Sequence, residues 1–330
     1  MRLAKCLAAA GLAICVVSAG AQADAPTQDL PRCLFVSSYH HGYAWSDGVE
    51  AGLRTVLDGK CEIRQFDMDT KRRKTEADKQ AAAREAKSII EDWRPDIVIT
   101  ADDNAARYLI KPFYRDHRIP FVFCGVNWTV DEYGFPYANV TGMIEVAPIV
   151  PMLKYALEAS SDAGRALYLG ADTLTEQKNL KRFQAAAARL GFNLDHVLAP
   201  TMHDWRAAYR AAQGYDFVII GSRAGINDWD SEAARREVLN ATRRFSVTNH
   251  DWMMPYTILG VTKMPEEHGE WAARTALSIL DGTAPGDIPI VSNSRRDLWL
   301  NAELLDASGL TISDRLLRRA KRIGTAQPRS

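Results

Sequence analysis

Short apolar runs alternate with longer stretches of helical spacing along most of the chain. In the first half, runs rich in β-branched and aromatic residues predict strands at residues 33–37, 62–67, 97–101 and 121–124. The amphipathic stretches between them predict helices at residues 45–57, 76–93 and 104–116. Strands that alternate with helices of this length indicate βαβ units and parallel sheets.

A stretch with clustered glycine and proline, YGFPYANVTGMIEVAPIV at residues 133–150, interrupts this order. The alternation then starts again, with strands predicted at residues 166–169, 194–199, 217–221 and 245–248 and helices at residues 175–190, 204–212 and 230–243. A short strand, a loop and a helix follow in residues 255–282, and a strand with two short helices in residues 298–323. The break and the length of 330 residues predict two α/β lobes, each large enough to bury its own core.

The first 25 residues have the pattern of a secretory signal peptide. Arg2 and Lys5 precede an apolar stretch at residues 7–17, and A-x-A cleavage patterns follow at residues 21–23 and 23–25. We expect this segment to be cleaved after export to a bacterial periplasm. No later segment has the length and apolar character of a membrane span, so no membrane insertion is expected after cleavage.

Cysteine spacing predicts one disulfide. Cys6 and Cys15 fall in the expected signal peptide, which leaves three cysteines in the exported chain. Export permits disulfides, and Cys33 and Cys61 open the first and second predicted strands, which usually pair in a doubly wound sheet. We therefore expect a Cys33–Cys61 disulfide and a buried thiol at Cys124.

The charge balance argues against a nucleic-acid partner. Forty-one basic and forty-one acidic residues give a formal net charge of zero, and nucleic-acid binding requires a basic excess or stripe. The main basic cluster, at residues 71–74, has the composition of a solvated loop before a helix.

Polar and aromatic side chains follow almost every predicted strand. In open α/β sheets, ligands bind in the crevice beyond the carboxyl ends of the strands. A set of such residues facing across two lobes describes a cleft for a small polar or aromatic molecule. The expected ligand-binding residues are Ser38, Tyr39, His40, Trp45, Asp102, Asp103, Asn127, Trp128, Asp172, Thr173, Arg223, Asn249 and Asp251.

Several of these residues have structural alternatives. Trp45 can instead start the first helix and pack under the sheet, and Tyr43 can likewise be a packing residue. The two aspartates can cap the helix that follows them. His40 and His41 are a potential metal pair, but no third ligand has motif spacing, so no metal and no cofactor are expected. Arg223, directly after a buried strand, is either a surface residue or a ligand-binding residue whose guanidinium group donates two parallel hydrogen bonds to a ligand carboxylate.

Catalytic motifs are missing from the sequence. It contains no G-x-S-x-G elbow, no H-E-x-x-H pair and no glycine-rich phosphate loop after a strand. We therefore expect a binding protein rather than an enzyme. An exported α/β hydrolase or metal-dependent enzyme is the alternative, and it would require a strained nucleophile or a set of metal ligands.

The two ends of the chain carry a family resemblance. The tail LWLNAELLDASGLTISDRLLRRAKRI resembles the C-terminal signature of the ABC-transporter substrate-binding family that includes the tryptophan/tyrosine-binding proteins. The head VSSYHHGYAWSDGVEAGL and the segment PDIVITADDNAARYLI also resemble that family. The tail matches the signature at Asn301, Leu304, Gly309, Leu310, Ile312, Leu316, Leu317, Ala320 and Ile323, whereas Ser313 stands where proline is common.

The resemblance implies a type I periplasmic-binding-protein fold with two Rossmann-like lobes, parallel sheets and three crossovers. We expect a first lobe of residues 26–142 and 255–284 after a signal peptide at 1–25, and a second lobe of residues 143–254 and 285–330. Hinges are expected near residues 139–143, 251–256 and 283–292. Closure of such hinges would capture the ligand between the lobes.

The resemblance also implies partners. A monomer would present a captured amino acid or similar ligand to an ABC-transporter permease, or alternatively act as a ligand-sensing subunit for a membrane histidine kinase. For an amino-acid ligand, one of the two aspartates at 102 and 103 would accept from the ammonium group and Arg223 would pair with the carboxylate. Tyr39 and Trp128 would cover the ligand side chain.

Overall fold

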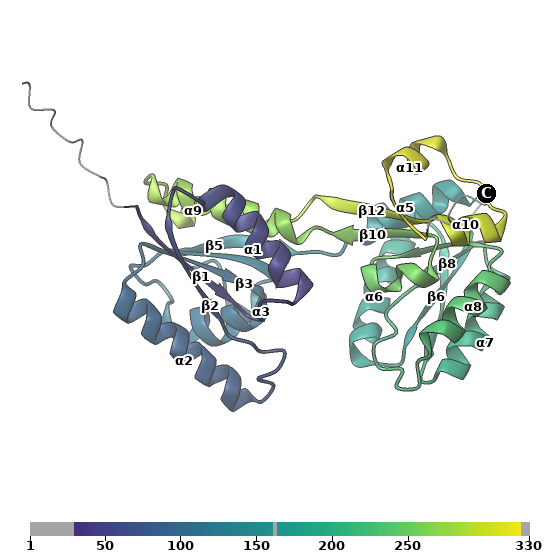
Figure 1. The fold of residues 1–330 in the computed structure, drawn as a ribbon, viewed down its shortest axis with the longest axis horizontal. Helices are drawn as coiled ribbons and strands as arrows, with labels where there is room; N and C mark the ends of the chain where they lie inside the picture. The colour runs from purple at the N-terminus through teal and green to yellow at the C-terminus, as the bar shows by residue number, and fades with distance from the viewer. Residues whose placement is uncertain (1–29, 161–163, 325–330) are drawn as a thin grey trace, which may run out of the picture. The chain divides into compact units, whose positions relative to one another are not determined.

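The structure, a computed structural model, describes residues 30–160 and 164–324. The expected signal peptide at residues 1–25, with Cys6 and Cys15, lies outside the described residues. Two mostly parallel sheets with flanking helices make up the described chain, as the sequence predicted (Figure 1).

The first sheet is parallel in every recorded pairing, and its strand order is β11-β5-β4-β3-β1-β2. Its strands are β1 (Arg32–Ser37), β2 (Glu62–Asp67), β3 (Ile97–Ala101), β4 (Phe121–Asn127), β5 (Val140–Glu145) and β11 (Val291–Ser292). The helices around it are α1 (Ala44–Leu57), α2 (Glu76–Trp93), α3 (Asp102–Ala105), α4 (Lys111–Phe113) and α9 (Pro265–Leu280). Helices α1 and α9 share a core with one face of the sheet, and α2 shares a core with the other.

The second sheet has the order β13-β12-β10-β9-β8-β6-β7, and its β10–β12 pair is antiparallel. Its strands are β6 (Arg165–Ala171), β7 (Asn193–Ala199), β8 (Phe217–Ile220), β9 (Phe245–Thr248), β10 (Leu259–Lys263), β12 (Arg296–Asn301) and β13 (Lys321–Ile323). Its helices are α5 (Ile149–Ala159), α6 (Leu174–Leu190), α7 (Met202–Ala212), α8 (Ser231–Ala241), α10 (Ala302–Ser308) and α11 (Asp314–Arg319).

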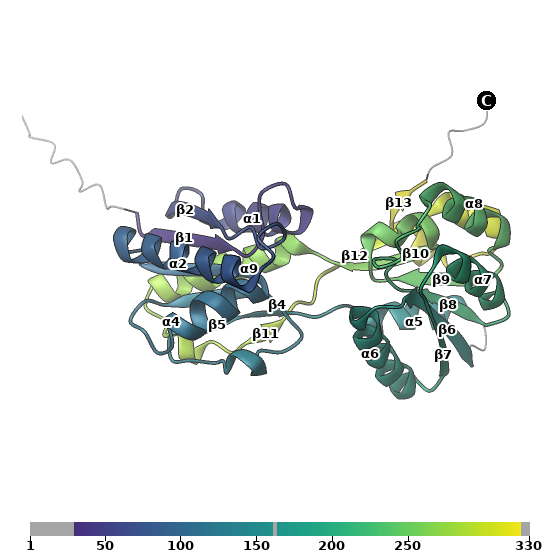
Figure 2. The same cartoon turned by 90° about the horizontal axis from the view of Figure 1, so that it is seen from below.

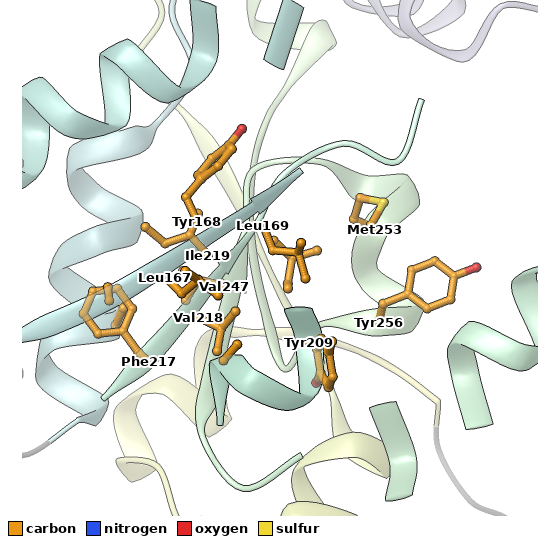
Figure 3. Packing of buried hydrophobic residues seen from close by; sticks show 14 of the residues in the cluster. Leu167, Tyr168, Leu169, Tyr209, Phe217, Val218, Ile219, Val247, Met253 and Tyr256 are labelled. Carbon is orange, nitrogen blue, oxygen red and sulfur yellow. The ribbon is translucent and has the colours of Figure 1, made fainter. Parts of the chain in front are cut away.

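Buried apolar side chains on the central strands hold the second sheet to its helices. Figure 3 shows Leu167, Leu169 and Val218 in this cluster, all buried, beside Tyr209 from α7. The phenol of Tyr209 lies 2.6 Å from the hydroxyl of Thr242, so its polar end is satisfied inside the core. Full burial of one such aliphatic side chain contributes about 1.5–3 kcal/mol.

Helix boundaries follow local capping chemistry. Thr75 accepts a hydrogen bond from the backbone N–H of Asp78, and the Asp78 carboxylate accepts from the Thr75 N–H, which forms a capping box before α2. Thr173 and Asp230 cap α6 and α8 with their side-chain oxygens, which accept hydrogen bonds from backbone N–H groups of the first turn. These side chains satisfy N–H groups that have no partner inside the helix.

Helices α1 and α9 approach each other closely because glycine occupies their contact. A Cβ atom built on Gly52 would lie 2.2 Å from the backbone oxygen of Glu266, and one built on Gly269 would lie 1.9 Å from the backbone oxygen of Val49. Any larger side chain would push the helices apart. This packing fixes the start of α9 against α1.

The chain passes between the two sheets three times, after β5, after β10 and after β11 (Figures 1 and 2). These passages lie at residues 145–149, 263–265 and 292–296, whereas the expected hinges were at 139–143, 251–256 and 283–292. The sheets therefore divide the chain at other residues than the expected lobe boundaries. Strand β10 belongs to the second sheet, and β5 and β11 belong to the first.

The largest local difference from the sequence prediction is β5, because residues 133–150 were expected to break the pattern. Gly142 lies inside this strand for a packing reason, since a Cβ there would lie 2.4 Å from the Phe123 ring. Glycine in this strand therefore marks a close approach to an aromatic side chain rather than a turn.

The cysteine prediction is confirmed. Cys33 and Cys61 form a disulfide, with a Cα–Cα distance of 5.9 Å, and Cys124 is a buried free thiol. In the part of the chain that the structure describes, no helix has the length and apolar character needed to cross a bilayer.

Candidate functional site

The carboxyl ends of four neighbouring strands meet at one edge of the first sheet. β1 pairs with β3, β3 with β4, and β4 with β5, in parallel register. The residues at or just beyond these ends are Tyr39, Asp102, Asn127 and Glu145. Asn127 and Glu145 are themselves register partners. Parallel pairing thus gathers an aromatic residue, two acids and an amide at one edge.

The second sheet supplies residues from three neighbouring strands. Residues 249–252 follow β9, and Lys263 ends β10. Strand β12 runs antiparallel to β10, so its first residues lie beside the last residues of β10, with Asp297 opposite Thr262. The start of β12 and the ends of β9 and β10 therefore contribute residues to the same region of the second sheet.

These residues line a cavity with a volume of about 430 Å³. Such a volume is within the range of small-molecule sites. The lining consists of five aromatic residues, five acids, one lysine, one histidine, three uncharged polar residues, an alanine and a proline. They are Tyr39, Tyr43, Ala44, Trp45, Asp102, Asn127, Glu145, Asn249, His250, Asp251, Trp252, Thr262, Lys263, Pro265, Glu266, Asp297 and Trp299.

Asp102 is the most constrained acid of this cavity. It is only 2% exposed, and its backbone has a φ of 70°, in the left-handed region that few residues other than glycine adopt. Its Oδ1 accepts a hydrogen bond of 2.9 Å from the indole Nε1 of Trp45, while its Oδ2 has no partner among the described residues. Burial, with the nearby charge of Asp103, raises the pKa of Asp102 to about 7.

Gly125 makes room for this carboxylate. A Cβ at Gly125 would lie 2.9 Å from Oδ1 of Asp102, and the backbone of Gly125 has a φ of 71°. Glycine is therefore required at this position of β4 for two reasons. Its backbone has a positive φ, and a Cβ atom would collide with the Asp102 carboxylate.

Lys263 and Glu145 form an ion pair beside Asp102. Glu145 is buried, and the ammonium group of Lys263 donates to its carboxylate. The Lys263 ammonium also lies 5.0 Å from the centre of the Trp45 ring, a distance at which the ring face attracts a cation. Burial lowers the pKa of Lys263 to about 8, although the charge of Asp102 opposes this.

Two histidines near the cavity are held neutral. Burial lowers the pKa of His250 to about 4, and its ring lies 4.5 Å from that of Trp252. Burial and the charge of Lys263 lower the pKa of His268 to about 3, and its ring lies 5.3 Å from that of Trp45. Neither imidazole contributes a positive charge at neutral pH.

The aromatic residues of the loop after β1 are part of this wall. Tyr39 and Tyr43 pack edge to face with ring centres 5.3 Å apart, and the ammonium group of Lys71 lies 4.2 Å and 4.9 Å from the two ring centres. Trp299 donates from Nε1 to the hydroxyl of Thr262 at 2.9 Å. Trp252 is about half exposed, which is unusual for a large apolar residue.

The structure brings together six of the thirteen residues expected to bind a ligand. Tyr39, Trp45, Asp102, Asn127, Asn249 and Asp251 line the cavity. The other seven, which do not line it, are Ser38, His40, Asp103, Trp128, Asp172, Thr173 and Arg223.

Three of these seven residues make polar contacts with other segments around the first sheet. The hydroxyl of Ser38 donates to the backbone oxygen of Ala101 at 2.5 Å and accepts from the N–H of Ala105 at 2.9 Å, which fixes the chain on both sides of Asp102. The Asp103 carboxylate accepts from the side-chain amide of Asn127 at 2.6 Å and from a tyrosine hydroxyl at 2.7 Å. His40 lies with its Nδ1 3.1 Å from a carboxylate oxygen of Asp69.

The remaining four residues lie elsewhere. Asp172 and Thr173 follow β6 and Arg223 follows β8, and both strands lie beyond β9 in the sheet order, away from the strands that supply the cavity. Thr173 caps α6. The Arg223 guanidinium lies 5.4 Å from the centre of the Trp229 ring, and the Trp128 ring contacts the guanidinium of Arg182 at 4.0 Å.

Sequence reasoning missed most of the residues at the passages between the sheets. The missed lining residues are Tyr43, Ala44, Glu145, His250, Trp252, Thr262, Lys263, Pro265, Glu266, Asp297 and Trp299. The segment VTKMPEE carries the signal that could have found the lysine. Lys263 ends an apolar strand there, two residues before Pro265, which starts a helix.

A larger cavity, of about 700 Å³, lies at the opposite ends of the strands. Its lining includes Arg94, Asp96, His117 and Pro120, which precede β3 and β4. Ligands of open α/β sheets bind at the carboxyl ends instead, so the smaller cavity is the candidate site. The described residues contain no group of three or more His, Cys, Asp or Glu side chains placed to hold a metal ion.

Comparison with solved structures identifies the fold. A substrate binding protein with adhesive properties from Clostridium difficile, in a ligand-free, open structure, matches with a TM-score of 0.73 at 12% identity over 90% of this chain and 100% of that one. A conserved domain protein from Vibrio cholerae matches with a TM-score of 0.59 at 18% identity, over 89% and 99%. An ABC domain from Streptococcus pneumonia in complex with L-Trp matches with a TM-score of 0.55 at 14% identity, over 88% and 99%.

The chain therefore has the type I periplasmic-binding-protein fold, with two α/β lobes and three crossovers. No protein-family model and no curated protein matches the sequence.

Proposed function

We propose that this protein is a monomeric periplasmic solute-binding protein that captures a small polar or aromatic molecule and does not alter it. The observation that carries the proposal is the 430 Å³ cavity, whose walls come from both sheets and from the passages between them. A molecule held there contacts both halves of the chain at once. Ligand contacts of this kind favour one arrangement of the two halves over another.

The passages between the sheets support a hinge mechanism. Lys263 and Pro265 line the cavity and lie at the passage after β10, while Glu145 lies at the passage after β5. Hinges are short segments that absorb backbone rotation, and here they would adjoin the bound molecule. Occupancy of the cavity would then set the arrangement of the halves that a membrane partner recognises.

The solved structures support the same role by analogy. The Clostridium difficile protein is described as a substrate binding protein, and the Streptococcus pneumonia domain was crystallised with L-Trp. We propose an ABC-transporter permease as the partner. A ligand-sensing role for a membrane histidine kinase uses the same cavity and is the second candidate, because the cavity is compatible with either partner.

A thermal-shift screen of amino acids, amines, nucleosides, sugars and small acids tests the proposal. A ligand at a hundredfold excess over its Kd stabilises the folded protein by roughly 2.7 kcal/mol, which gives a clear rise in Tm. We expect at least one compound to raise the Tm, and Ala44→Trp to abolish the rise by filling the cavity.

Ala51→Trp is the matched control, since Ala51 is an exposed residue of the same helix and does not line the cavity. The proposal fails if no compound stabilises the protein, if the effect survives Ala44→Trp, or if the stabilising compound is recovered chemically changed.

A further inference from the structure

We infer that the molecule held in this cavity is a small organic cation, a protonated amine attached to a flat aromatic or apolar body, and that binding requires no ligand carboxylate. This inference rests on the proposed function and specifies its ligand class. Such a cation differs from the amino-acid ligand that the sequence suggested, because an amino acid needs one partner for its ammonium group and another for its carboxylate.

The charged residues of the lining are mostly acidic. Five carboxylic acids face one lysine, and no arginine is found among the described residues of the wall. The lysine, Lys263, is already paired with Glu145. Asp297 is paired with Lys321, which donates to it at 2.8 Å from outside the cavity. Asp102, Asp251 and Glu266 form no salt bridge with a basic side chain among the described residues, although the charges of Lys71 and Lys263 act on Asp102 from a greater distance.

Asp102 provides a buried carboxylate oxygen that can accept a hydrogen bond from a cation. Its Oδ2 is buried and has no hydrogen-bond partner among the described residues, although the residue lines the cavity. An unsatisfied buried oxygen costs free energy, and an ammonium N–H placed against it would supply both the hydrogen bond and the compensating charge. The other oxygen, held by Trp45, fixes the direction in which Oδ2 points.

The aromatic walls suit a flat cation. The rings of Tyr39, Tyr43 and Trp45 each already have a lysine ammonium within 5.0 Å of their centres, which shows that their faces attract positive charge in this arrangement. The Lys321 ammonium lies 5.0 Å from the centre of the Trp299 ring, whereas no lysine or arginine lies over the Trp252 ring among the described residues. Trp252 therefore offers an exposed face on which an aromatic body can stack.

A ligand carboxylate has no matching partner. Arg223, the residue expected to pair with one, follows β8 and does not line the cavity. Use of Lys263 for that purpose would take its ammonium group from the buried Glu145. Leaving a buried carboxylate unpaired is strongly unfavourable, so an anionic group on the ligand would weaken binding.

Three indoles that share a two-carbon side chain and differ in its ionised groups test the inference by isothermal titration calorimetry at pH 7.5. They are tryptamine, which is a cation, L-tryptophan, which carries both charges, and indole-3-propionate, which is an anion. Tyramine serves as a second cation, with a phenol ring in place of the larger indole. We expect an amine to bind at one site, roughly tenfold or more tighter than L-tryptophan, with no measurable binding of the anion.

Asp102→Asn keeps the shape of the side chain and removes its charge. We expect this variant to weaken amine binding by roughly tenfold or more, and the control Asp172→Asn, at an exposed acid outside the cavity, to leave it unchanged. The inference is overturned if neither amine binds, if L-tryptophan or the anion binds as tightly as tryptamine, or if Asp102→Asn retains full amine affinity.

These failures remain distinct from failure of the proposed function. If an uncharged or anionic compound of the thermal-shift screen binds and Ala44→Trp abolishes its binding, the solute-binding role stands and the cation class is wrong. If nothing in that screen binds, both are wrong.

Discussion

Replacing Asp102 by asparagine should change the pH dependence of stability. Asparagine tolerates the positive φ of this position and can still accept the hydrogen bond from Trp45, so the backbone and the contact are kept. What the substitution removes is the buried titrating group. The charges that act on it are those of Asp103, Lys71 and Lys263.

The magnitude follows from the raised pKa. Burial moves the pKa of Asp102 from an ordinary 3.8 to about 7, so between these values the folded chain binds more protons than the unfolded chain. This carboxyl group therefore makes the parent protein less stable as the pH rises from about 4 to about 7, and its effect is constant above that. The full loss is roughly 4 kcal/mol, of which roughly 2–3 kcal/mol falls between pH 5 and pH 8.

Amide hydrogen exchange of the β3 amides, followed by mass spectrometry on ligand-free protein, measures this effect locally. At each pH the intrinsic exchange rate cancels between variant and parent, so the ratio of rates gives the difference in opening free energy. We expect Asp102→Asn to gain roughly 2–3 kcal/mol relative to the parent between pH 5 and pH 8. A difference in opening free energy that does not change with pH, or that decreases as the pH rises, would refute the reasoning. For the control Asp172→Asn we expect this difference to be independent of pH.

Three further changes test the packing around the site. Gly52→Ala places a Cβ 2.2 Å from the backbone oxygen of Glu266, so we expect unfolding by urea to show a loss of about 1–3 kcal/mol. Lys263→Met leaves the Glu145 carboxylate buried without its partner, and we expect a loss of about 3–5 kcal/mol by the same assay. Cys61→Ser opens a disulfide with a sequence separation of 28 residues, and we expect a loss of about 3–4 kcal/mol under oxidising conditions.

Each of these variants has a matched control. Gly164→Ala adds a Cβ where nothing lies within 4 Å, so a similar loss there would show that the Gly52 effect is not steric. Glu145→Gln combined with Lys263→Met should recover most of the stability lost by the single change, and no recovery would contradict the ion-pair explanation. In excess reductant the parent and Cys61→Ser should be equally stable, and a persistent difference would assign the loss to packing.

The fold could be predicted because each α/β unit carries its own signal. Strands such as β3 are mostly apolar and buried along their whole length, and the helices between them have amphipathic spacing and capping residues. Strand β5 was not predicted, because the glycine and proline residues near it have the pattern of a turn. Gly142 is needed there by the Phe123 ring, a contact that only the folded sheet reveals.

About a third of the site could be predicted, because residues after parallel strands gather at one edge. That rule found Asp102 and Asn249 but gave equal weight to Arg223, since the sequence does not show how far β8 lies from β10. It missed Asp297 and Trp299 because the antiparallel pairing of β12 with β10 places the start of a strand, not its end, at the site. Long-range sheet order is the information that one sequence did not supply.

Native mass spectrometry of the protein incubated with a mixture of amines, amino acids, sugars and small acids tests the central claim most directly. We expect one compound to bind with a stoichiometry of one, to dissociate at its original mass, and to be absent from the spectrum of Ala44→Trp but present in that of Ala51→Trp. A spectrum with no bound compound, a compound released at a changed mass, or an adduct that Ala44→Trp retains would contradict the claim that this cavity holds a small molecule without altering it.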